Sequence, residues 1–298
     1  MKFSIVTPAY NMEQWISHTI ESVLSQAGDF EIEYIIVDGG SSDKTLAIAE
    51  SYAIEISEKR YPTHCNVVTM RVIPQEQSGM YMAINEGFTI ATGDVYAWIN
   101  ADDTYQPGAF AAIAATLSAF PDIEWIKGIT DTIDSEWHTV RTGACRIYRR
   151  DWLEQGIYGR ESYFIEQDSC FWRADLWKKA GPIPVHYRRA GDYWLWLSFA
   201  QIAPLWSLDV PISNFMKREG QLSRDIEKYA AEQGKARPRR TFTAWSARFF
   251  FAPWSRLGPA FHPIFLKLYP LLFMQTPFEY IHIEGAQITK RIAQSFIV

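Results

Sequence analysis

Two adjacent carboxylates, Asp102 and Asp103, follow a short apolar run and are residue types that bind hard divalent cations. Mg²⁺ and Mn²⁺ prefer oxygen ligands and leave coordination positions open for phosphate or water. A cation held here would act as a Lewis acid on a phosphate leaving group. An Asp-Asp pair is also common in an ordinary solvated turn, so this pair alone leaves both interpretations open.

Two further positions could hold a nucleotide. Asp38 ends a β-rich run and could accept hydrogen bonds from a base or a ribose, although a turn aspartate before two glycines is the alternative. Gly79 opens a helical pattern. A glycine there would let the backbone approach a phosphate, which the N-terminus of a helix favours.

Asp192 is the candidate general base. It stands at the start of an apolar helical pattern that includes Tyr193, Trp194 and Leu195. The helix dipole favours the ionised carboxylate, and such a carboxylate could accept a proton from an attacking hydroxyl. An N-cap aspartate with no chemical role is the alternative.

The elements that must position these residues alternate between strand and helix over the first 120 residues. Strand patterns cover 3–6, 32–37, 67–73 and 95–99, and helical patterns cover 16–27, 44 onward, 79–91 and 107–120. Such alternation predicts a parallel sheet, whose ligands bind beyond the carboxyl ends of the strands. Residues 7–11, Asp38 and the Asp102-Asp103 pair occupy those ends.

The alternation weakens from Lys127 onward. We expect a short helix over 174–180, a buried helix over 192–202, and two short strands over 205–208 and 212–216. Residues 226–240 are polar and basic, which predicts a linker or an exposed helix. The tail, 241–298, is rich in Trp, Phe and Pro.

Composition narrows the class of protein. The net charge of -5 argues against non-specific nucleic-acid binding. Three cysteines without a CxxC pair indicate neither a zinc site nor a disulfide framework. With no signal peptide and no apolar run of about 18 residues, we expect a cytoplasmic location. The aromatic content of 15% has two interpretations, core packing or contacts with sugars and membranes.

Read together, these segments resemble the family 2 glycosyltransferases with the GT-A fold. The resemblance covers residues 2–224 and rests on a series of motifs in order. The motifs are 4–11 (SIVTPAYN), 33–45 (EYIIVDGGSSDKT), 79–87 (GMYMAINEG), 91–94 (ATGD), 98–103 (WINADD), 167–173 (QDSCFWR), 190–197 (AGDYWLWL) and 220–223 (GQLS).

The resemblance implies an α/β GT-A fold, with a Rossmann-like, mostly parallel sheet flanked by helices. The corresponding organisation is a glycosyltransferase domain over 1–225 and an aromatic-rich helical extension over 226–298. Within the domain, 1–126 would bind the nucleotide sugar and 127–225 would form the acceptor side.

The resemblance also implies the reaction and the site residues. The reaction is an inverting transfer of a sugar, by default from a UDP-sugar, to an acceptor hydroxyl in polysaccharide or glycolipid assembly. Asp192 would be the general base. Nucleotide-sugar binding falls to Thr7, Ala9, Tyr10, Asp38, Gly79, Asp102 and Arg218, and Asp103 with Asp102 would hold Mn²⁺ or Mg²⁺, Asp103 being the favoured direct ligand.

Several departures from the family pattern bear on substrate identity. Gln77-Ser78 and Met82 replace residues that are often charged in relatives, and Arg218-Glu219 stands where a His is common. Arg218 could contact a diphosphate or be a surface charge. A non-catalytic nucleotide-binding scaffold is the alternative function. The tail over 241–298 could contact a membrane at the inner face, cover the acceptor side or form an oligomer interface.

Overall fold

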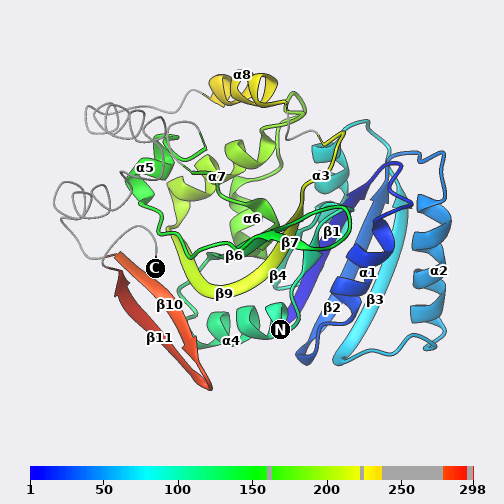
Figure 1. Ribbon diagram of the computed structural model, residues 1–298, viewed down its shortest axis with the longest axis horizontal. Helices are drawn as coiled ribbons and strands as arrows, with labels where there is room; N and C mark the ends of the chain where they lie inside the picture. The colour runs from blue at the N-terminus through cyan, green and yellow to red at the C-terminus, as the bar shows by residue number, and fades with distance from the viewer. Residues whose placement is uncertain (160–162, 222–224, 237–277, 294–297) are drawn as a thin grey trace.

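The computed structural model describes residues 1–159, 163–221, 225–236, 278–293 and 298. Within these residues, eleven strands form one mixed sheet with helices on both faces (Figure 1). The strand order along the main path is β11-β10-β9-β6-β8-β4-β1-β2-β3, and β5 and β7 pair with β9 and β6.

The N-terminal half is a parallel βαβ array, as the alternating pattern predicts. Its strands β3, β2, β1 and β4 lie side by side in that order and are all parallel. The elements are β1 (Lys2–Ala9), α1 (Ile16–Leu24), β2 (Gly28–Asp38), α2 (Thr45–Ser57), β3 (Cys65–Pro74), α3 (Met80–Ile90) and β4 (Val95–Trp98).

Side chains that alternate along each strand divide the core between the two faces of the sheet. Phe3 and Ile5 of β1 pack in one cluster with α1, α2 and α4 (Ala109–Ala119). Val6 packs in the other cluster with α3 and with the helices of the C-terminal half. The sheet is therefore covered on both sides, which leaves its carboxyl edge as the place for a site.

The C-terminal half adds antiparallel strands to the sheet, so the mostly parallel sheet expected from the sequence is mixed in this part. Strand β8 runs antiparallel to both β4 and β6, whereas β6 and β9 are parallel. The two short strands expected over 205–216 are one strand, β9. The elements are β5 (Thr104–Tyr105), β6 (Trp125–Ile133), β7 (Thr139–Arg141), α5 (Arg150–Glu154), β8 (Cys170–Arg173), α6 (Ala174–Ala180), α7 (Gly191–Ile202) and β9 (Leu205–Met216).

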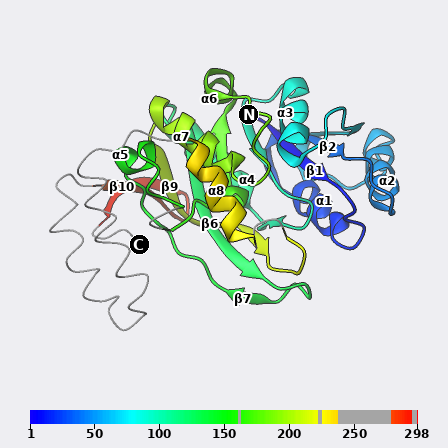
Figure 2. The ribbon, with the colours of Figure 1, turned by 90° about the horizontal axis from the view of Figure 1, so that it is seen from above.

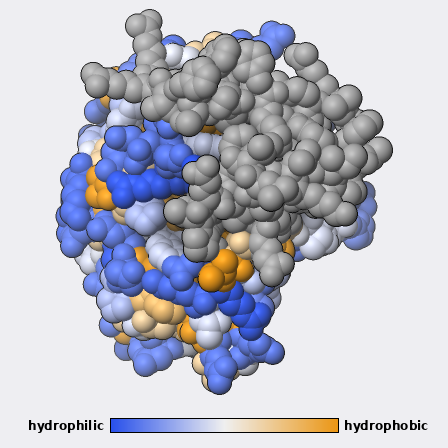
Figure 3. Space-filling model, turned by 90° about the vertical axis from the view of Figure 1, so that its left-hand side faces the viewer, coloured by the Kyte–Doolittle hydropathy of each residue, from blue (hydrophilic) through white to orange (hydrophobic). Residues whose placement is uncertain are grey.

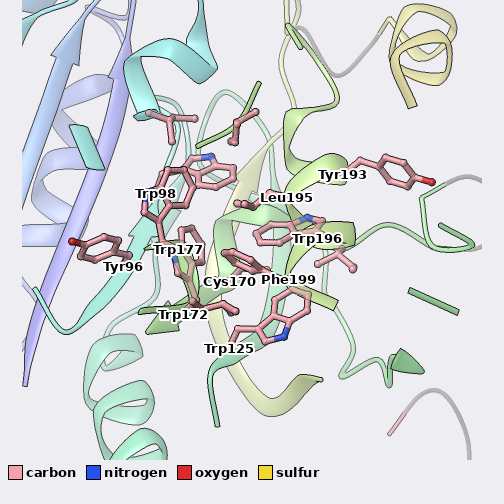
Figure 4. Close-up of a cluster of buried hydrophobic side chains, with 14 of the residues drawn as sticks. Tyr96, Trp98, Trp125, Cys170, Trp172, Trp177, Tyr193, Leu195, Trp196 and Phe199 are labelled. Atoms are coloured by element: carbon pink, nitrogen blue, oxygen red, sulfur yellow. The ribbon is translucent and has the colours of Figure 1, made fainter. Parts of the chain in front are cut away.

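Much of the aromatic content forms the core on the α7 side (Figure 4). The rings of Trp98 and Trp196 stack at 5.8 Å between centroids, and Trp125 stacks on Trp196 at 5.6 Å. Trp172 meets Trp98 edge to face. Core packing is thus the correct interpretation for these tryptophans, and they fix α7 against β4, β6 and β8.

The chain continues through α8 (Ile226–Ala236), β10 (Phe278–Glu284) and β11 (Gln287–Ala293). Strand β10 pairs in parallel with β9 through Ile281 and Leu208, and Ile281 is fully buried. Residues 278–293 therefore extend the main sheet as a β-hairpin, which corrects the expected helical extension for this stretch.

Most of the aromatic tail, residues 237–277, lies outside the described residues, so its expected membrane or oligomer contact stays a prediction. None of the helices in the described part of the chain has the length and apolarity to cross a bilayer. On the side of the molecule near β10 and α5, the described surface is largely hydrophilic with scattered hydrophobic residues (Figure 3).

Candidate functional site

The carboxyl ends of β1, β2 and β4 bring the predicted nucleotide and metal residues to one edge of the sheet. Ala9 at the end of β1 is in register with Asp38 at the end of β2, and Val6 is in register with Trp98 of β4. The loop that carries Asp102 and Asp103 begins two residues after Trp98. Three chain segments far apart in sequence therefore meet beyond these strand ends.

In the first of these segments, at the end of β1, Tyr10 is the side chain exposed for contact with a ligand. Tyr10 is 59% exposed, whereas Ala9 is buried and its carbonyl accepts a hydrogen bond from Gly39 N at 2.8 Å. The Thr7 hydroxyl is fully buried and lies 3.0 Å from Tyr34 Oη. We therefore assign the Thr7 side chain to the core, which corrects its expected place on the binding surface.

The Asp38 carboxylate accepts most of its hydrogen bonds from residues of its own turn. Its Oδ2 accepts hydrogen bonds from the N–H groups of Gly40 and Ser41, each at 3.0 Å, and its Oδ1 accepts one from Ser41 Oγ at 2.6 Å. Gly40 has a φ of 81°, which glycine adopts readily. The turn interpretation left open by the sequence thus accounts for these contacts, and a nucleotide would have to share the carboxylate with them.

Asp102 is the carboxylate of the pair that faces a cation. Its Oδ2 accepts hydrogen bonds from Arg218 Nε at 2.8 Å and from Gln221 Nε2 at 3.3 Å. The Arg218 guanidinium lies over the ring of Trp15, 4.3 Å from its centroid. Arg218 is therefore held inside the candidate site and is not the solvated surface charge that the sequence also allowed.

Asp103 has both oxygens engaged within the protein. Oδ1 accepts a hydrogen bond from Met216 N at 2.8 Å, and Oδ2 accepts one from Asn100 Nδ2 at 3.1 Å. Burial, together with the nearby Asp102 and Asp168 charges, raises the pKa of Asp103 well above its usual range. Within the described residues Asp102 accepts hydrogen bonds only through Oδ2, so its Oδ1 is the oxygen of the pair with the fewest protein contacts, and the direct metal ligand stays a prediction.

The charge balance at this edge fits a bound cation. Asp102, Asp103 and Asp168 are all at least nine-tenths buried, and the Asp168 carboxylate is hydrogen-bonded by Ser213. Arg218 is the cation seen paired with Asp102. Across the described residues, no three His, Cys, Asp or Glu side chains converge as metal ligands. A metal here would therefore need phosphate or water oxygens to complete its coordination, as Mg²⁺ commonly does.

Gly79 begins α3 with a φ of 123°, a conformation that side-chain-bearing residues rarely adopt. A Cβ at this position would meet no atom within 4 Å, so the glycine is required by the backbone and faces open space. The N-terminus of α3 is thus accessible to an anion, in keeping with the expected phosphate contact.

Asp192 lies in the first turn of α7, where two tyrosines from other helices reach it. Asp192 Oδ1 lies 3.2 Å from Tyr81 Oη of α3 and 3.1 Å from Tyr229 Oη of α8. Burial raises the pKa of Asp192 to about 6, against the opposing effect of hydrogen bonds from Tyr193 N and the two tyrosines. The carboxylate is therefore a base poised to titrate near neutral pH, less firmly ionised than the helix dipole alone predicted.

Sequence reasoning missed the partners of Asp192. Tyr81 stood within a recognised motif but had no expected role, and Tyr229 fell in the stretch described as a linker or exposed helix. Gly191 explains how α7 approaches Tyr81, because a Cβ there would lie 2.8 Å from the Tyr81 ring. The Ala190-Gly191-Asp192 sequence was the available signal, since a glycine directly before a candidate base indicates close backbone packing.

Comparison with known proteins defines the class. The family model described as "Glycosyl transferase family 2" matches residues 4–135, which include the strand ends and the Asp102-Asp103 loop. Residues 4–135 therefore match glycosyltransferase family 2.

Individual relatives agree with this assignment. The PGL/p-HBAD biosynthesis glycosyltransferases of Mycobacterium tuberculosis and Mycobacterium bovis are 27% identical to it over 195 residues, covering 64% of this chain and 66% of theirs. Uncharacterized glycosyltransferase YibD of Escherichia coli is 28% identical over 167 residues, covering 53% of this chain and 45% of its own. The chain thus spans about two thirds or less of the length of these relatives.

Solved structures share the fold. The crystal structure of S. aureus TarS in complex with UDP-GlcNAc has a TM-score of 0.55 at 19% identity and covers 76% of this chain and 61% of its own. TarS in complex with UDP gives a TM-score of 0.55 at 18% identity, with coverage of 78% and 65%. The α/β arrangement is therefore GT-A-like, as the sequence resemblance implied.

Proposed function

We propose that this chain is an inverting glycosyltransferase that moves a sugar from a nucleotide-sugar donor to an acceptor hydroxyl, with Asp192 as the general base. The observation that supports it most directly is that one helix, α3, connects the expected phosphate site with the base. Helix α3 begins at Gly79 beside the strand ends, and its Tyr81 contacts Asp192. The same helix thus reaches both the expected phosphate site and the base.

The proposed reaction is a single displacement. The acceptor oxygen attacks the anomeric carbon of the donor sugar and forms the new C–O bond, while its proton passes to the Asp192 carboxylate. The bond between the anomeric carbon and the diphosphate oxygen breaks on the opposite side, which inverts the configuration. The nucleoside diphosphate leaves with the electron pair of that bond.

The departing diphosphate gains negative charge that must be stabilised. Arg218 would contribute to this, because a guanidinium can donate paired hydrogen bonds to phosphate oxygens; its position beside Asp102 supports the proposal. Asp102 with Asp103 would hold Mn²⁺ or Mg²⁺, which supplies Lewis-acid stabilisation of the leaving group when bound. Tyr10, exposed at the end of β1, offers a ring on which a base could stack.

Relatives suggest the substrate class. The TarS structure holds UDP-GlcNAc, and the mycobacterial relatives are named for glycolipid biosynthesis. We therefore propose a UDP-sugar donor and a saccharide or lipid-linked saccharide acceptor, used in the cytoplasm or at the inner face of the membrane.

The proposal is tested first by thermal shift with UDP, GDP, dTDP and CDP, each with and without Mn²⁺. A ligand that binds only the folded state raises the melting temperature. At a ligand concentration a hundredfold above Kd, the free energy of unfolding increases by about 2.7 kcal/mol. We expect a metal-dependent shift with UDP, retained in the exposed-site control Asp175→Asn and reduced in Asp102→Asn.

Transfer to a panel of saccharide and lipid-linked acceptors is then measured with the UDP-sugar that binds. Turnover that requires Asp192 supports the proposal. Binding of UDP without hydrolysis or transfer of any UDP-sugar would favour the non-catalytic scaffold, and no shift with any nucleotide would contradict the donor site itself.

A further inference from the structure

We propose that α8, which lies beyond both the family match and the motif series, is a working part of the active site and positions Asp192 through Tyr229 and Glu232. This inference rests on the proposed role of Asp192 as the base. Figure 1 shows α8 on the side of the molecule toward which β1 points, and Figure 2 shows it crossing beside α7. Tyr229 and Glu232 act on the base, so they are positioning residues.

Glu232 fixes the backbone that leads into Asp192. Its Oε2 accepts hydrogen bonds from the N–H groups of Arg188 at 3.0 Å, Arg189 at 2.8 Å and Ala190 at 3.0 Å. The residue is 8% exposed. Burial opposes ionisation, but these N–H groups outweigh it and lower the pKa of Glu232. The Glu232 carboxylate thus binds three consecutive backbone N–H groups directly before α7.

Tyr229 donates its hydroxyl proton to Asp192. Tyr81 Oη lies 2.8 Å from the Arg189 carbonyl, closer than its 3.2 Å to Asp192 Oδ1. A hydroxyl carries one proton, and a carbonyl oxygen only accepts. Among the described residues, Asp192 is the one acceptor seen for Tyr229 Oη, at 3.1 Å. Tyr229 is therefore the more committed donor to the base.

The position of α8 is set by contacts outside Asp192 as well. Gln233, which is buried, donates from Nε2 to the Gly159 carbonyl at 3.0 Å, and the Tyr229 ring meets Phe164 edge to face at 5.7 Å. The described part of the stretch 226–240 is therefore a helix with mostly exposed residues, one of the two expected alternatives, and it is anchored to the domain through these buried side chains. They also hold Tyr229 where its hydroxyl reaches Asp192 Oδ1.

The decisive experiment compares Tyr229→Phe with wild type in the pH profile of kcat/KM for transfer. The lost hydrogen bond favoured the charged carboxylate, so the acidic limb should move from near pH 6 to higher pH by about one unit. The donor KM should not change. The matched control is Tyr52→Phe, which removes a tyrosine hydroxyl 2.6 Å from the Glu21 carboxylate on another face and should leave the profile unchanged.

A second variant keeps the inference open to contradiction if Tyr229→Phe does not fold. Glu232→Gln should lower kcat about tenfold with an unchanged donor KM, because its weaker hold on residues 188–190 misplaces the base. Glu227→Gln, an exposed change on the same helix, serves as its control.

The outcomes separate this inference from the proposed function. An inactive Asp192→Asn together with an unmoved acidic limb in Tyr229→Phe, or an unchanged kcat in Glu232→Gln if Tyr229→Phe is unfolded, overturns the role of α8 alone. Normal transfer by Asp192→Asn overturns the base assignment itself, and with it this inference.

Discussion

Arg218 Nε donates a hydrogen bond to Asp102 Oδ2 at 2.8 Å across a separation of 116 residues in the chain. The pair joins the loop after β4 to the loop after β9, and the side chains of both residues are largely buried. Because Asp102 is also a candidate metal ligand, the same carboxylate pairs with Arg218 in the structure and would bind Mn²⁺ or Mg²⁺ in the proposed reaction.

Arg218→Ala should weaken binding of UDP by about ten- to a hundredfold and leave binding of UMP nearly unchanged. The guanidinium is proposed to contact the diphosphate, and a hydrogen bond to a charged group contributes roughly 1.5–3 kcal/mol. Isothermal titration calorimetry measures both affinities. Arg218→Lys should restore little, since an ammonium cannot reproduce the fork of donors or the contact with Trp15. Equal losses for UDP and UMP would instead indicate that Arg218 only supports the fold.

Asp192→Asn should lower kcat by about 10² to 10⁴ while preserving the UDP-dependent melting shift. An amide has the shape of the carboxylate but cannot accept the hydroxyl proton, and general-base catalysis is typically of this size. Single-turnover transfer with bound donor measures the chemical step. Asp192→Glu, which keeps the carboxylate but moves it, should retain more activity than Asp192→Asn, and the reverse order would exclude Asp192 as the base.

The stability of Asp192→Asn relative to wild type should depend on pH. The pKa of Asp192 is raised by burial to about 6, so its favourable contribution is complete below the unfolded pKa and is lost as pH rises through 6. The wild type should therefore lose up to about 3 kcal/mol against Asp192→Asn between roughly pH 4 and pH 7. Urea unfolding across this range measures the difference, and a pH-independent difference would show that Asp192 is not perturbed.

Glu166→Ala should destabilise the protein by about 3–5 kcal/mol by leaving buried Lys127 without its ion-pair partner. Lys127 Nζ lies 3.0 Å from Glu166 Oε2, Arg146 Nη1 lies 2.8 Å from Glu166 Oε1, and the Lys127 side chain is 3% exposed. Denaturant unfolding at pH 7 measures the loss.

The double variant Lys127→Met/Glu166→Ala should recover part of that stability, because it removes the uncompensated charge. Burial acts against ionisation of Glu166, but the two cations lower its pKa, so the stabilisation should disappear as pH falls through the folded pKa. An equally destabilised double variant would contradict this account.

Local pattern was sufficient for the N-terminal half of the fold. Each strand and helix from β1 to β4 shows its own hydrophobic periodicity in the sequence. Parallel strands joined through helices can be arranged in few topologies. The candidate positions Asp38, Asp102 and Asp103 could be placed at the same sheet edge on that basis alone. The C-terminal half could not, because β8 has only four residues and both β6 and β8 pair with strands distant in sequence.

What the sequence by itself determined is therefore the class of fold, the strand-end carboxylates and the identity of Asp192 as a candidate base. Only the tertiary structure decided what surrounds them. It committed Asp103 to Met216, paired Asp102 with Arg218, and brought Tyr229 of α8 to Asp192. The physical reason is that a carboxylate's role depends on which donors and charges lie within a few ångströms, and here those groups come from residues 37 to 116 positions away.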